Sequence, residues 1–509
     1  MTLNRSNIHR SFTFTGMKKA LFLLLMICSL KGLAQSQYLW NDKVQKTYES
    51  MSSLRIPEAR KIIDKELSNH TNNLFYSLLE SGADLYQSFF NENLIEYNNF
   101  YPRFEKRIDL IKAGPKNTPY YLYSLGLLHF HKAILAIKFD KNIEAALDYR
   151  KAYVLFKENK ELYPKFGPNN LYFGLLTTII GAVPTNYQWM LNVLGFKGSI
   201  TKGNELVLSY INSKDENTKM AMNEALLIYP YLVMNFEGNT KKAFDFIEHA
   251  NYDFKKNHIH AYMATNLYLN HQQPQKALEI AGNIEQGEAY LAMPFWNYEK
   301  GHGYFYAMKL DNAEKELLSF INTFKGNFYV KDAYEKLSLI AYLQNDLKKA
   351  NEYRAEVIKK GNLITEADKL AYQNANAKIW PNLLLLKARI LSDGGFQAQA
   401  LNVLADKTSL DFTTEEDRAE FSYRLARIYD LMGDKELAIK YYKSTIVKGK
   451  NLKQYFAARA ALQIGLIYED RKDYTNAITF YTNCMEMKNT AFKNSLDQKA
   501  KSGILRCQK

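Results

Sequence analysis

The chain has 509 residues, and its 67 lysines and arginines exceed its 53 aspartates and glutamates, giving a formal net charge of +14. Five of those basic residues and no acid lie in residues 1–34, so the remainder carries +9 with no cluster of lysine or arginine. A weak, dispersed excess of this kind argues against a nucleic-acid partner. It is compatible with acidic protein partners or a membrane surface.

The N-terminus has the three parts of a secretory signal peptide. Two lysines precede the apolar run 20–30, and the small residues Gly32 and Ala34 stand just before Gln35. The run is only about half as long as a membrane span, so a cleaved signal is favoured over a retained anchor.

We therefore expect residues 1–34 to be removed and the protein to be exported, either to the periplasm or to an outer membrane. Residues 1–16 lie upstream of a better start at Met17, which is consistent with a mis-assigned start.

Residues 35–215 have the three-to-four spacing of apolar side chains that is typical of helices, and we interpret them as an N-terminal helical domain. Tyr120–Phe139 is a strongly apolar helix, and a second helix from Ala145 to Tyr153 follows a short polar turn. Two helices joined in this way predict a helical hairpin.

The stretch Phe166–Phe196 contains no charged side chain in 31 consecutive positions. Burying an unpaired charge is costly, so such a run is expected to be surrounded by protein or lipid. Pro184 interrupts the stretch, and its most apolar part, Leu171–Val183, is too short to cross a bilayer. We favour a buried hairpin of two short helices over a hairpin inserted in a membrane.

Residues 216–509 show a repeat. The stretches that begin at Arg424 and Gln463 align with a constant offset of 39, and the matched positions are Ala426 with Gly465, Tyr429 with Tyr468, Ala438 with Ala477, and Tyr442 with Tyr481. The pattern resembles the tetratricopeptide repeat, in which a small residue lets two helices cross closely while an aromatic residue fills the next gap.

Seven alanines anchor successive units, at positions 243, 277, 313, 350, 400, 438 and 477. The spacing of 50 between the fourth and fifth leaves room for an insertion around Gly361–Lys378. The fold class we predict is all-α, a tetratricopeptide-like α-solenoid of stacked antiparallel helix pairs. The alternative is a long α-protein without a repeat.

The front half also resembles the tetratricopeptide repeat protein 39 family, which includes the fungal inclusion-body-clearance proteins. The resemblance covers residues 120–210 and includes a "GF-x-G-x-x-x-x-G" element at Gly195, Phe196, Gly198 and Gly203. It implies an all-helical repeat fold without catalysis, in which each glycine allows a turn or a close helix contact and Phe196 anchors the core. Thr177–Val183 departs from the family's double serine-leucine run.

No constellation of catalytic or metal-binding residues is evident. His129 and His131 are two residues apart, as are His258 and His260, and this spacing points their rings to different faces of a helix. We interpret them as core or edge histidines and predict no catalytic residue, no metal and no cofactor. Cys484 fits a packing position, and whether it pairs with Cys507 is left open.

The groove of the repeats offers candidate binding residues. Arg389 and Arg427 follow the small residues of successive units, and Tyr423 lies about one turn before Arg427. This set could receive an acidic peptide, because arginine makes charge-assisted bonds to carboxylates. The alternative is a salt bridge within the repeat, with Asp430 available one turn on. In repeat register His302 also faces the groove.

Our leading hypothesis is an exported, non-enzymatic helical-repeat scaffold of the cell envelope that binds another protein or peptide along its groove. The second hypothesis is a membrane-associated repeat protein that handles or senses lipid through Phe166–Phe196. The oligomeric state is not encoded in any pattern that we recognise.

Overall fold

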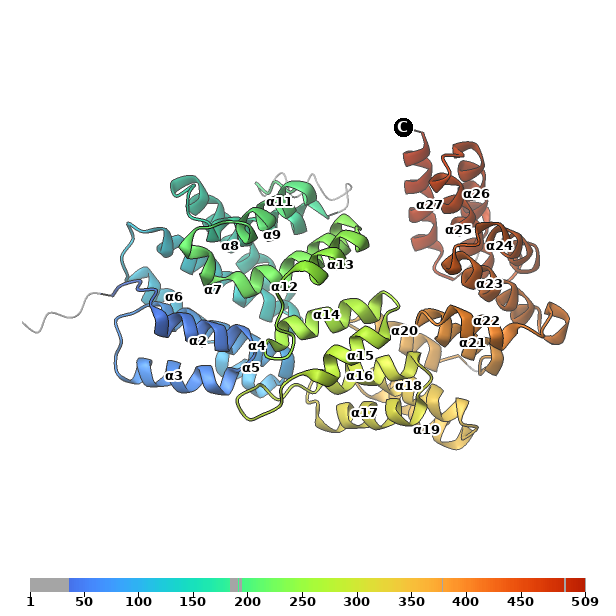
Figure 1. Ribbon diagram of the computed structural model, residues 1–509, viewed down its shortest axis with the longest axis horizontal. Coiled ribbons are helices and arrows are strands. Elements are labelled where there is room, and N and C mark those ends of the chain that lie inside the picture. Colours follow the sequence, from blue (N-terminus) through green and yellow to red (C-terminus); the bar gives the residue numbers. More distant parts are fainter. Residues whose placement is uncertain (1–35, 184–190, 192–194, 378, 489–490, 509) are drawn as a thin grey trace, which may run out of the picture. The chain divides into compact units, whose positions relative to one another are not determined.

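A computed structural model describes residues 36–183, 191, 195–377, 379–488 and 491–508, and within these residues the chain is all-α (Figure 1). The exception to helix is an isolated β-bridge between Gln37 and Asn73. The predicted signal peptide and the second half of the predicted apolar hairpin, 184–190 and 192–194, lie outside the described residues.

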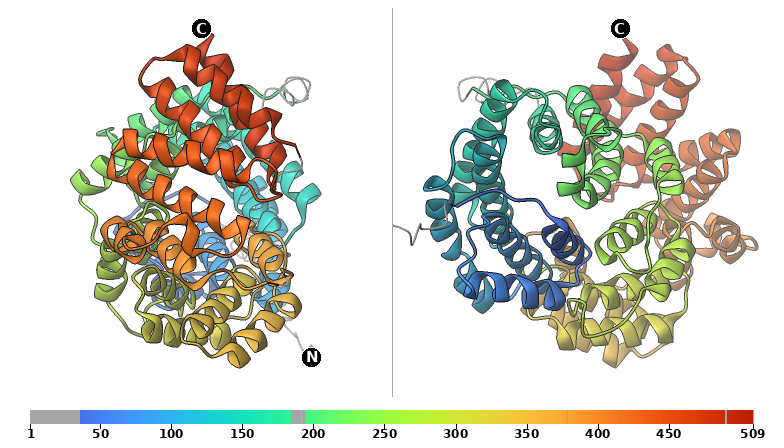
Figure 2. Two further views of the ribbon diagram at one scale, coloured as in Figure 1. Left: turned by 90° about the vertical axis from the view of Figure 1, so that its right-hand side faces the viewer. Right: turned by 60° about the vertical axis from the view of Figure 1, so that its left-hand side comes forward.

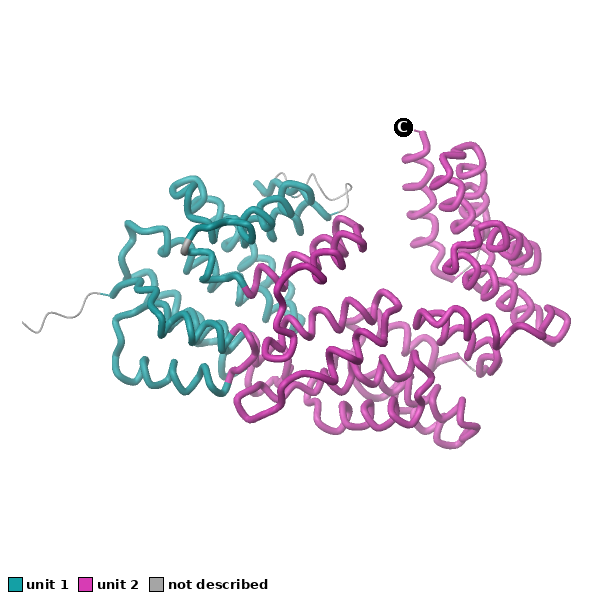
Figure 3. Tube along the Cα trace, viewed as in Figure 1, with its two compact units in different colours: residues 1–51, 57–85, 98–222 teal, residues 52–56, 86–97, 223–509 magenta. Residues whose placement is uncertain are grey.

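The chain divides into two compact units (Figure 3). Unit 1 comprises residues 1–51, 57–85 and 98–222, and unit 2 comprises 52–56, 86–97 and 223–509. The helices of the N-terminal part are α2 (Asp42–Ser52), α3 (Ile56–Ser68), α4 (Phe75–Asn91), α5 (Leu94–Phe100), α6 (Arg103–Lys112), α7 (Pro119–Lys138), α8 (Asn142–Leu162), α9 (Pro168–Gly181), α11 (Ile200–Ile211) and the 3-10 turn η2 (Glu216–Met220).

Unit 2 continues with α12 (Met222–Leu232), the π-helical turn η3 (Val233–Glu237), α13 (Thr240–His249), α14 (His258–Asn270), α15 (Pro274–Asn283), α16 (Phe295–Tyr306), α17 (Leu310–Thr323), α18 (Val330–Leu343), α19 (Leu347–Lys359), α20 (Glu366–Ala375), α21 (Leu383–Asp393), α22 (Gln397–Leu404), the 3-10 turn η4 (Ser409–Asp411), α23 (Glu415–Met432), α24 (Lys435–Gly449), α25 (Phe456–Asp470), α26 (Tyr474–Glu486) and α27 (Lys493–Cys507).

The helices of unit 2 form antiparallel pairs, and the pairs pack on one another in a solenoid whose order is interrupted after α19 (Figure 2). All seven anchor alanines lie on the second helix of a pair and have 0 or 1% of their surface exposed. A Cβ added at Gly465 on α25 would lie 2.6 Å from the ring of Tyr481 on α26. The small-against-large contact that the repeat predicts is therefore present.

Capping fixes the start of many second helices. Asn239, Asp346, Asp434 and Asp473 each stand four residues before an anchor alanine and accept a hydrogen bond from a backbone amide of the first turn. This satisfies a donor that the helix leaves free, and aspartate and asparagine are preferred there for that reason. In these four pairs the cap fixes the start of the second helix at a constant distance from its anchor alanine.

Two short segments from the N-terminal part of the chain belong to unit 2. The Ser53 and Leu54 carbonyls accept hydrogen bonds of 3.3 and 2.8 Å from the amides of His258 and Leu291. Farther along, Glu92 accepts a 2.8 Å hydrogen bond from the amide of Asn327. Residues 52–56 are therefore tied to the repeats by backbone hydrogen bonds, and residues 86–97 by the side chain of Glu92.

The described half of the apolar stretch packs inside unit 1. Its helix α9 lies against α11 and α8, and Leu171 and Leu176 are fully buried. Among the described residues no helix combines the length and the apolar character needed to cross a membrane. The helix α9 is therefore buried within protein, as we favoured for the apolar stretch.

The glycine-phenylalanine element has the local roles that the resemblance implied. Gly195 has φ +77°, a conformation that favours glycine, and the buried Phe196 lies 5.0 Å from the ring of Tyr153. A Cβ added at Gly203 would lie 2.5 Å from the Gly174 carbonyl oxygen and 2.7 Å from the Thr178 amide nitrogen. Helices α9 and α11 can approach this closely because residue 203 has no side chain.

We predict that Gly203→Ala destabilises unit 1 by about 3 kcal/mol, because the new methyl group meets backbone atoms that cannot rotate away. Thermal unfolding followed by circular dichroism measures the effect. Gly282→Ala on α15 is the control, since a Cβ there meets no atom within 4 Å. Equal melting temperatures for the two variants would contradict the close approach of α9 and α11.

Candidate functional site

The stacking of helix pairs in unit 2 changes after α19. Helix α20, which lies in the predicted insertion, packs on α18 and α19, and the next pair meets α16 through α21. The Gln272 side-chain amide donates a 3.2 Å hydrogen bond to the Ser392 carbonyl, which ties α21 to the turn between α14 and α15. Because α20 covers part of α18 and α19, the α21/α22 pair packs against an earlier part of the stack.

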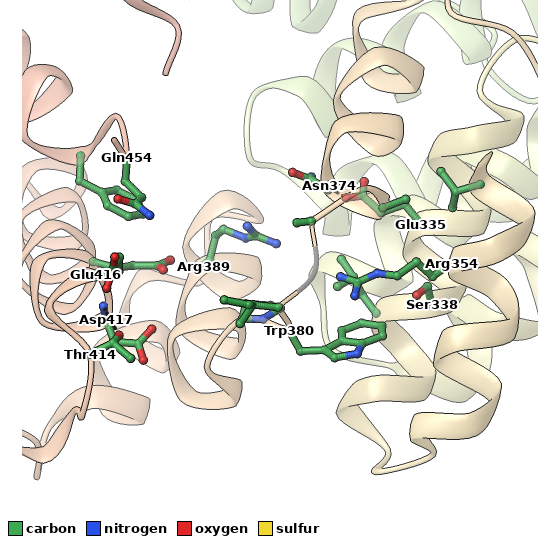
Figure 4. A pocket seen from close by; sticks show the side chains of 18 residues that line it. Glu335, Ser338, Arg354, Asn374, Trp380, Arg389, Thr414, Glu416, Asp417 and Gln454 are labelled. Atoms are coloured by element: carbon green, nitrogen blue, oxygen red, sulfur yellow. Dashed lines mark hydrogen bonds between the residues drawn. The ribbon is translucent and has the colours of Figure 1, made fainter. Parts of the chain in front are cut away.

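A pocket of about 410 Å³ lies at this interruption, within unit 2 (Figure 4). Helices α18, α19 and α20 line one side, and α21 and the first turn of α23 line the other. The volume is within the range of ligand sites in proteins, roughly 300–1,000 Å³. We call this the Arg354–Arg389 pocket.

The two arginines enter the pocket from different helices, Arg354 from α19 and Arg389 from α21 (Figure 4). The Arg354 guanidinium carbon lies 3.7 Å from the ring centroid of Trp380, a cation–π contact. Among the described residues neither guanidinium has a hydrogen bond or an ion pair. Burial lowers the pKa of Arg354 from its ordinary value, which is a sign that its charge is partly desolvated.

Trp380 forms the aromatic floor between the arginines. Its ring stacks on Tyr342 with 4.4 Å between the centroids and 20° between the planes. The Tyr342 hydroxyl donates a 3.0 Å hydrogen bond to the Pro381 carbonyl, which holds the segment that carries Trp380. The indole is therefore positioned by neighbours and remains partly open to the pocket.

Carboxylates line the pocket as well. Glu335 on α18 accepts a 2.6 Å hydrogen bond from the Asn374 amide, and burial raises the pKa of Glu335. Glu416 and Asp417 lie in the first turn of α23, where the helix dipole stabilises negative charge. Within the described chain neither of these two has an ion pair, and burial raises the pKa of Asp417. The pocket thus presents both signs of charge.

The structure separates the four residues that the sequence predicted to bind a partner. Arg389 lines the pocket, as an accessible side chain. Arg427 instead lies 3.4 Å from Asp430 on its own helix, which is the salt-bridge alternative. The set is therefore not one site.

The expectation that Tyr423 faces a groove is wrong. Only 2% of its surface is exposed, because the Phe456 ring of α25 lies 5.3 Å away and the Tyr442 ring of α24 6.1 Å away. Helix α25 covers the face of α23 that the repeat register left open. Tyr423 is a core residue.

His302 also lies away from the pocket, in contact with the rings of Tyr298 and Tyr306 at 5.2 and 5.1 Å. Burial lowers the pKa of His302 to about 3, so the ring is neutral at physiological pH. A neutral imidazole outside the pocket adds no positive charge to the candidate binding residues, so His302 does not form one site with Arg389.

The four histidines at the two-residue spacings are core residues, as predicted. His129 lies 2.7 Å from Asp148 and His131 2.7 Å from Ser81, while His258 and His260 each lie 2.8 Å from a backbone carbonyl. The part of the chain that the structure describes holds no group of three or more candidate metal ligands. Cys484 and Cys507 are both buried free thiols.

Sequence reasoning missed Arg354, Trp380, Glu416 and Asp417. The local pattern gave one signal, the Trp380–Pro381 pair at the end of the predicted insertion. Arg354 gave none, because its place in a pocket depends on where α21 packs, and that contact is remote in sequence.

The fold and the pocket define unit 2 as a helical-repeat domain with tetratricopeptide repeats. The sequence model of the tetratricopeptide repeat matches residues 419–444 and 458–490, which correspond to the pairs α23/α24 and α25/α26. No curated protein matches the chain.

Among solved structures, the chain is similar to one in the crystal structure of the APC/C hetero-tetramer Cut9–Hcn1, with 12% sequence identity. The match covers 89% of this chain and 95% of that chain, with a TM-score of 0.22. A score of this size adds nothing to the repeat assignment.

A buried polar network runs behind His302. Lys336 lies 2.6 Å from Asp332, which also accepts a 2.7 Å hydrogen bond from the Tyr298 hydroxyl. The neighbouring Glu299 is 2% exposed and accepts a 3.2 Å hydrogen bond from the Asn266 amide. Burial raises the pKa of Glu299 to about 7, although hydrogen bonds oppose the shift.

Because the folded state holds the Glu299 proton up to about pH 7, the stability contributed by protonated Glu299 is present below its ordinary pKa and lost as pH rises to about 7. We predict that Glu299→Gln, which has no proton to lose, gains about 3 kcal/mol relative to the natural chain between pH 4 and pH 8. Urea unfolding at several pH values measures this.

The exposed Glu288→Gln is the control and is expected to leave the pH dependence unchanged. Parallel stability curves for Glu299→Gln and the natural chain would show that residue 299 is not protonated in the folded state.

Proposed function

We propose that this protein is an exported, non-enzymatic helical-repeat scaffold that binds a protein or peptide partner in the cell envelope. The observation that carries the proposal is the Arg354–Arg389 pocket, in which two guanidinium groups share a cavity without ion-pair partners in the described chain. Arginine is over-represented where carboxylates are recognised, because its planar donors match them.

The repeat architecture supports this role. Stacked helix pairs present extended surfaces that suit protein capture. The histidines offer no free imidazole pair, because His129, His131, His258 and His260 are each engaged in a hydrogen bond inside the fold. A binding function requires only the accessible surface of the stacked helix pairs.

Export rests on the signal-peptide pattern of residues 1–34. The relation to the tetratricopeptide repeat protein 39 family rests on residues 120–210 and, like export, is a proposal. The intracellular role of that family does not fit an exported chain. N-terminal sequencing of protein from a fractionated envelope is expected to begin at Gln35, and recovery from the cytosol with residues 1–34 intact would refute export.

We predict that tagged protein recovers a discrete partner from gently solubilised envelopes and that Arg354→Gln/Arg389→Gln lowers the recovery about tenfold or more. The loss follows from removing both cations of the pocket. Quantitative mass spectrometry of the captured proteins measures it, and Arg471→Gln is the control, because Arg471 pairs with Glu436 outside the pocket.

Equal recovery by the double variant and the control would show that the pocket does not bind the partner. Recovery of lipid without protein would favour the second hypothesis, lipid handling. The structure gives that hypothesis no specific support, since the described half of the apolar stretch packs against α8 and α11.

A further inference from the structure

Four charged side chains of the Arg354–Arg389 pocket, two basic and two acidic, form no ion pairs with one another. Elsewhere in unit 2 exposed cations find acids, as Lys300 does with Glu316 at 3.4 Å and Lys276 with Glu248 at 2.8 Å. Inside the pocket, Arg354, Arg389, Glu416 and Asp417 line one cavity without forming an ion pair with any described residue. Arg354, Arg389 and Asp417 are half-buried, so their charges are partly desolvated, whereas Glu416 is exposed. A ligand with matching charges offsets the cost of that desolvation.

The charges are arranged in order across the pocket. Figure 4 shows Glu416 and Asp417 at one side, Arg354 at the other, and Arg389 with Trp380 between them. The order makes one side of the pocket a site for a cation and the other a site for an anion.

The cationic side keeps its donors available. Arg354 uses the face of its guanidinium against Trp380, so its N–H groups, which lie in the plane, are not consumed by that contact. Glu335 is the nearest acid to this side, and its carboxylate already accepts from Asn374. This side of the pocket therefore has two arginines and one carboxylate that is already hydrogen-bonded, so it can receive an anion.

The middle of the pocket is apolar and aromatic. Trp380 lies there and is fixed by its stack on Tyr342, and Ile379, Pro381 and Phe456 are further apolar residues of the pocket lining. A ligand must therefore carry its two charges at opposite ends of a largely apolar body. An extended peptide of a few residues has this form, because its termini are charged at pH 7 and it spans about 3.5 Å per residue.

We propose that the Arg354–Arg389 pocket binds a short peptide as a zwitterion, with its terminal carboxylate at Arg354 and Arg389 and its terminal ammonium at Glu416 and Asp417. The inference rests on the proposed binding role of unit 2 and specifies its ligand class. Side chains of the peptide lie against Trp380 and Phe456. Specificity comes from the two termini, because they meet charged groups of the pocket that form no ion pair with any described residue.

The test uses alanyl-leucyl-alanine, its N-acetylated form and its C-terminal amide as probes of the purified full chain, with isothermal titration calorimetry at pH 7. We expect the free tripeptide to bind and each capped form to bind about tenfold or more weakly, because each cap removes one charge. Low ionic strength keeps the charge interactions unscreened.

Two variants test which side of the pocket binds each terminus of the peptide. In Arg389→Gln the C-terminal amide is expected to cost clearly less affinity than in the natural chain, because one of the two guanidinium groups at the carboxylate is gone. Glu416→Gln is expected to reduce the cost of N-acetylation in the same way. This is a thermodynamic cycle between a residue and a terminus. Arg471→Gln and Glu415→Gln are matched controls that lie outside the pocket lining, and both are expected to keep the full effect of each cap.

The inference is overturned if the tripeptide does not bind at millimolar concentration, or if the caps change its affinity less than twofold. It is also overturned if Arg389→Gln and Glu416→Gln keep the cap effects, since the termini would then lie elsewhere. A partner captured from envelopes whose recovery depends on Arg354 and Arg389 would, in either case, leave the scaffold function standing without the peptide site. If neither the capture experiment nor the peptide titration gives the expected result, both the scaffold function and the peptide site are refuted.

Discussion

The close crossing of paired helices at a small residue is the constraint on which unit 2 depends. Each anchor alanine is completely or almost completely buried, and in the last two pairs a buried tyrosine, Tyr442 on α24 or Tyr481 on α26, follows four residues later on the same helix. A larger side chain at such a site would push the two helices apart and carry the displacement to the next pair, because packed interiors transmit strain. The capping residues four positions earlier place the alanine where it is needed.

The pocket exists because one helix departs from this regularity. α20 packs on α18 and α19, and α21 contacts α16, so a space remains between two parts of the stack. Side chains that would meet a neighbouring helix in a continuous stack instead line a cavity. Of the charged residues there, Glu420 pairs with Arg424 on its own helix, whereas Arg354, Arg389, Glu416 and Asp417 form no ion pair with any described residue.

Features set by local spacing could be predicted from the sequence, and features set by remote contacts could not. The alanines, the helix pairs and the insertion follow from periodicity, and Arg389 follows from its place beside the buried Ala388. Tyr423 was misplaced because the cover that Phe456 provides comes from the next pair. Arg354 and Trp380 meet in the pocket only after the chain returns to α16, which no local pattern encodes.

The hydrogen bond from Gln272 to Ser392 closes a loop of 120 residues. Most contacts in a repeat protein are between neighbours, so such a closure raises the contact order and carries an entropic cost that the α21 contacts must offset. During synthesis the walls of the pocket emerge at different times, and the cavity is complete only once the start of α25 has been made. A ligand that bridges both walls would therefore stabilise the closed loop, coupling occupancy to the last step of folding.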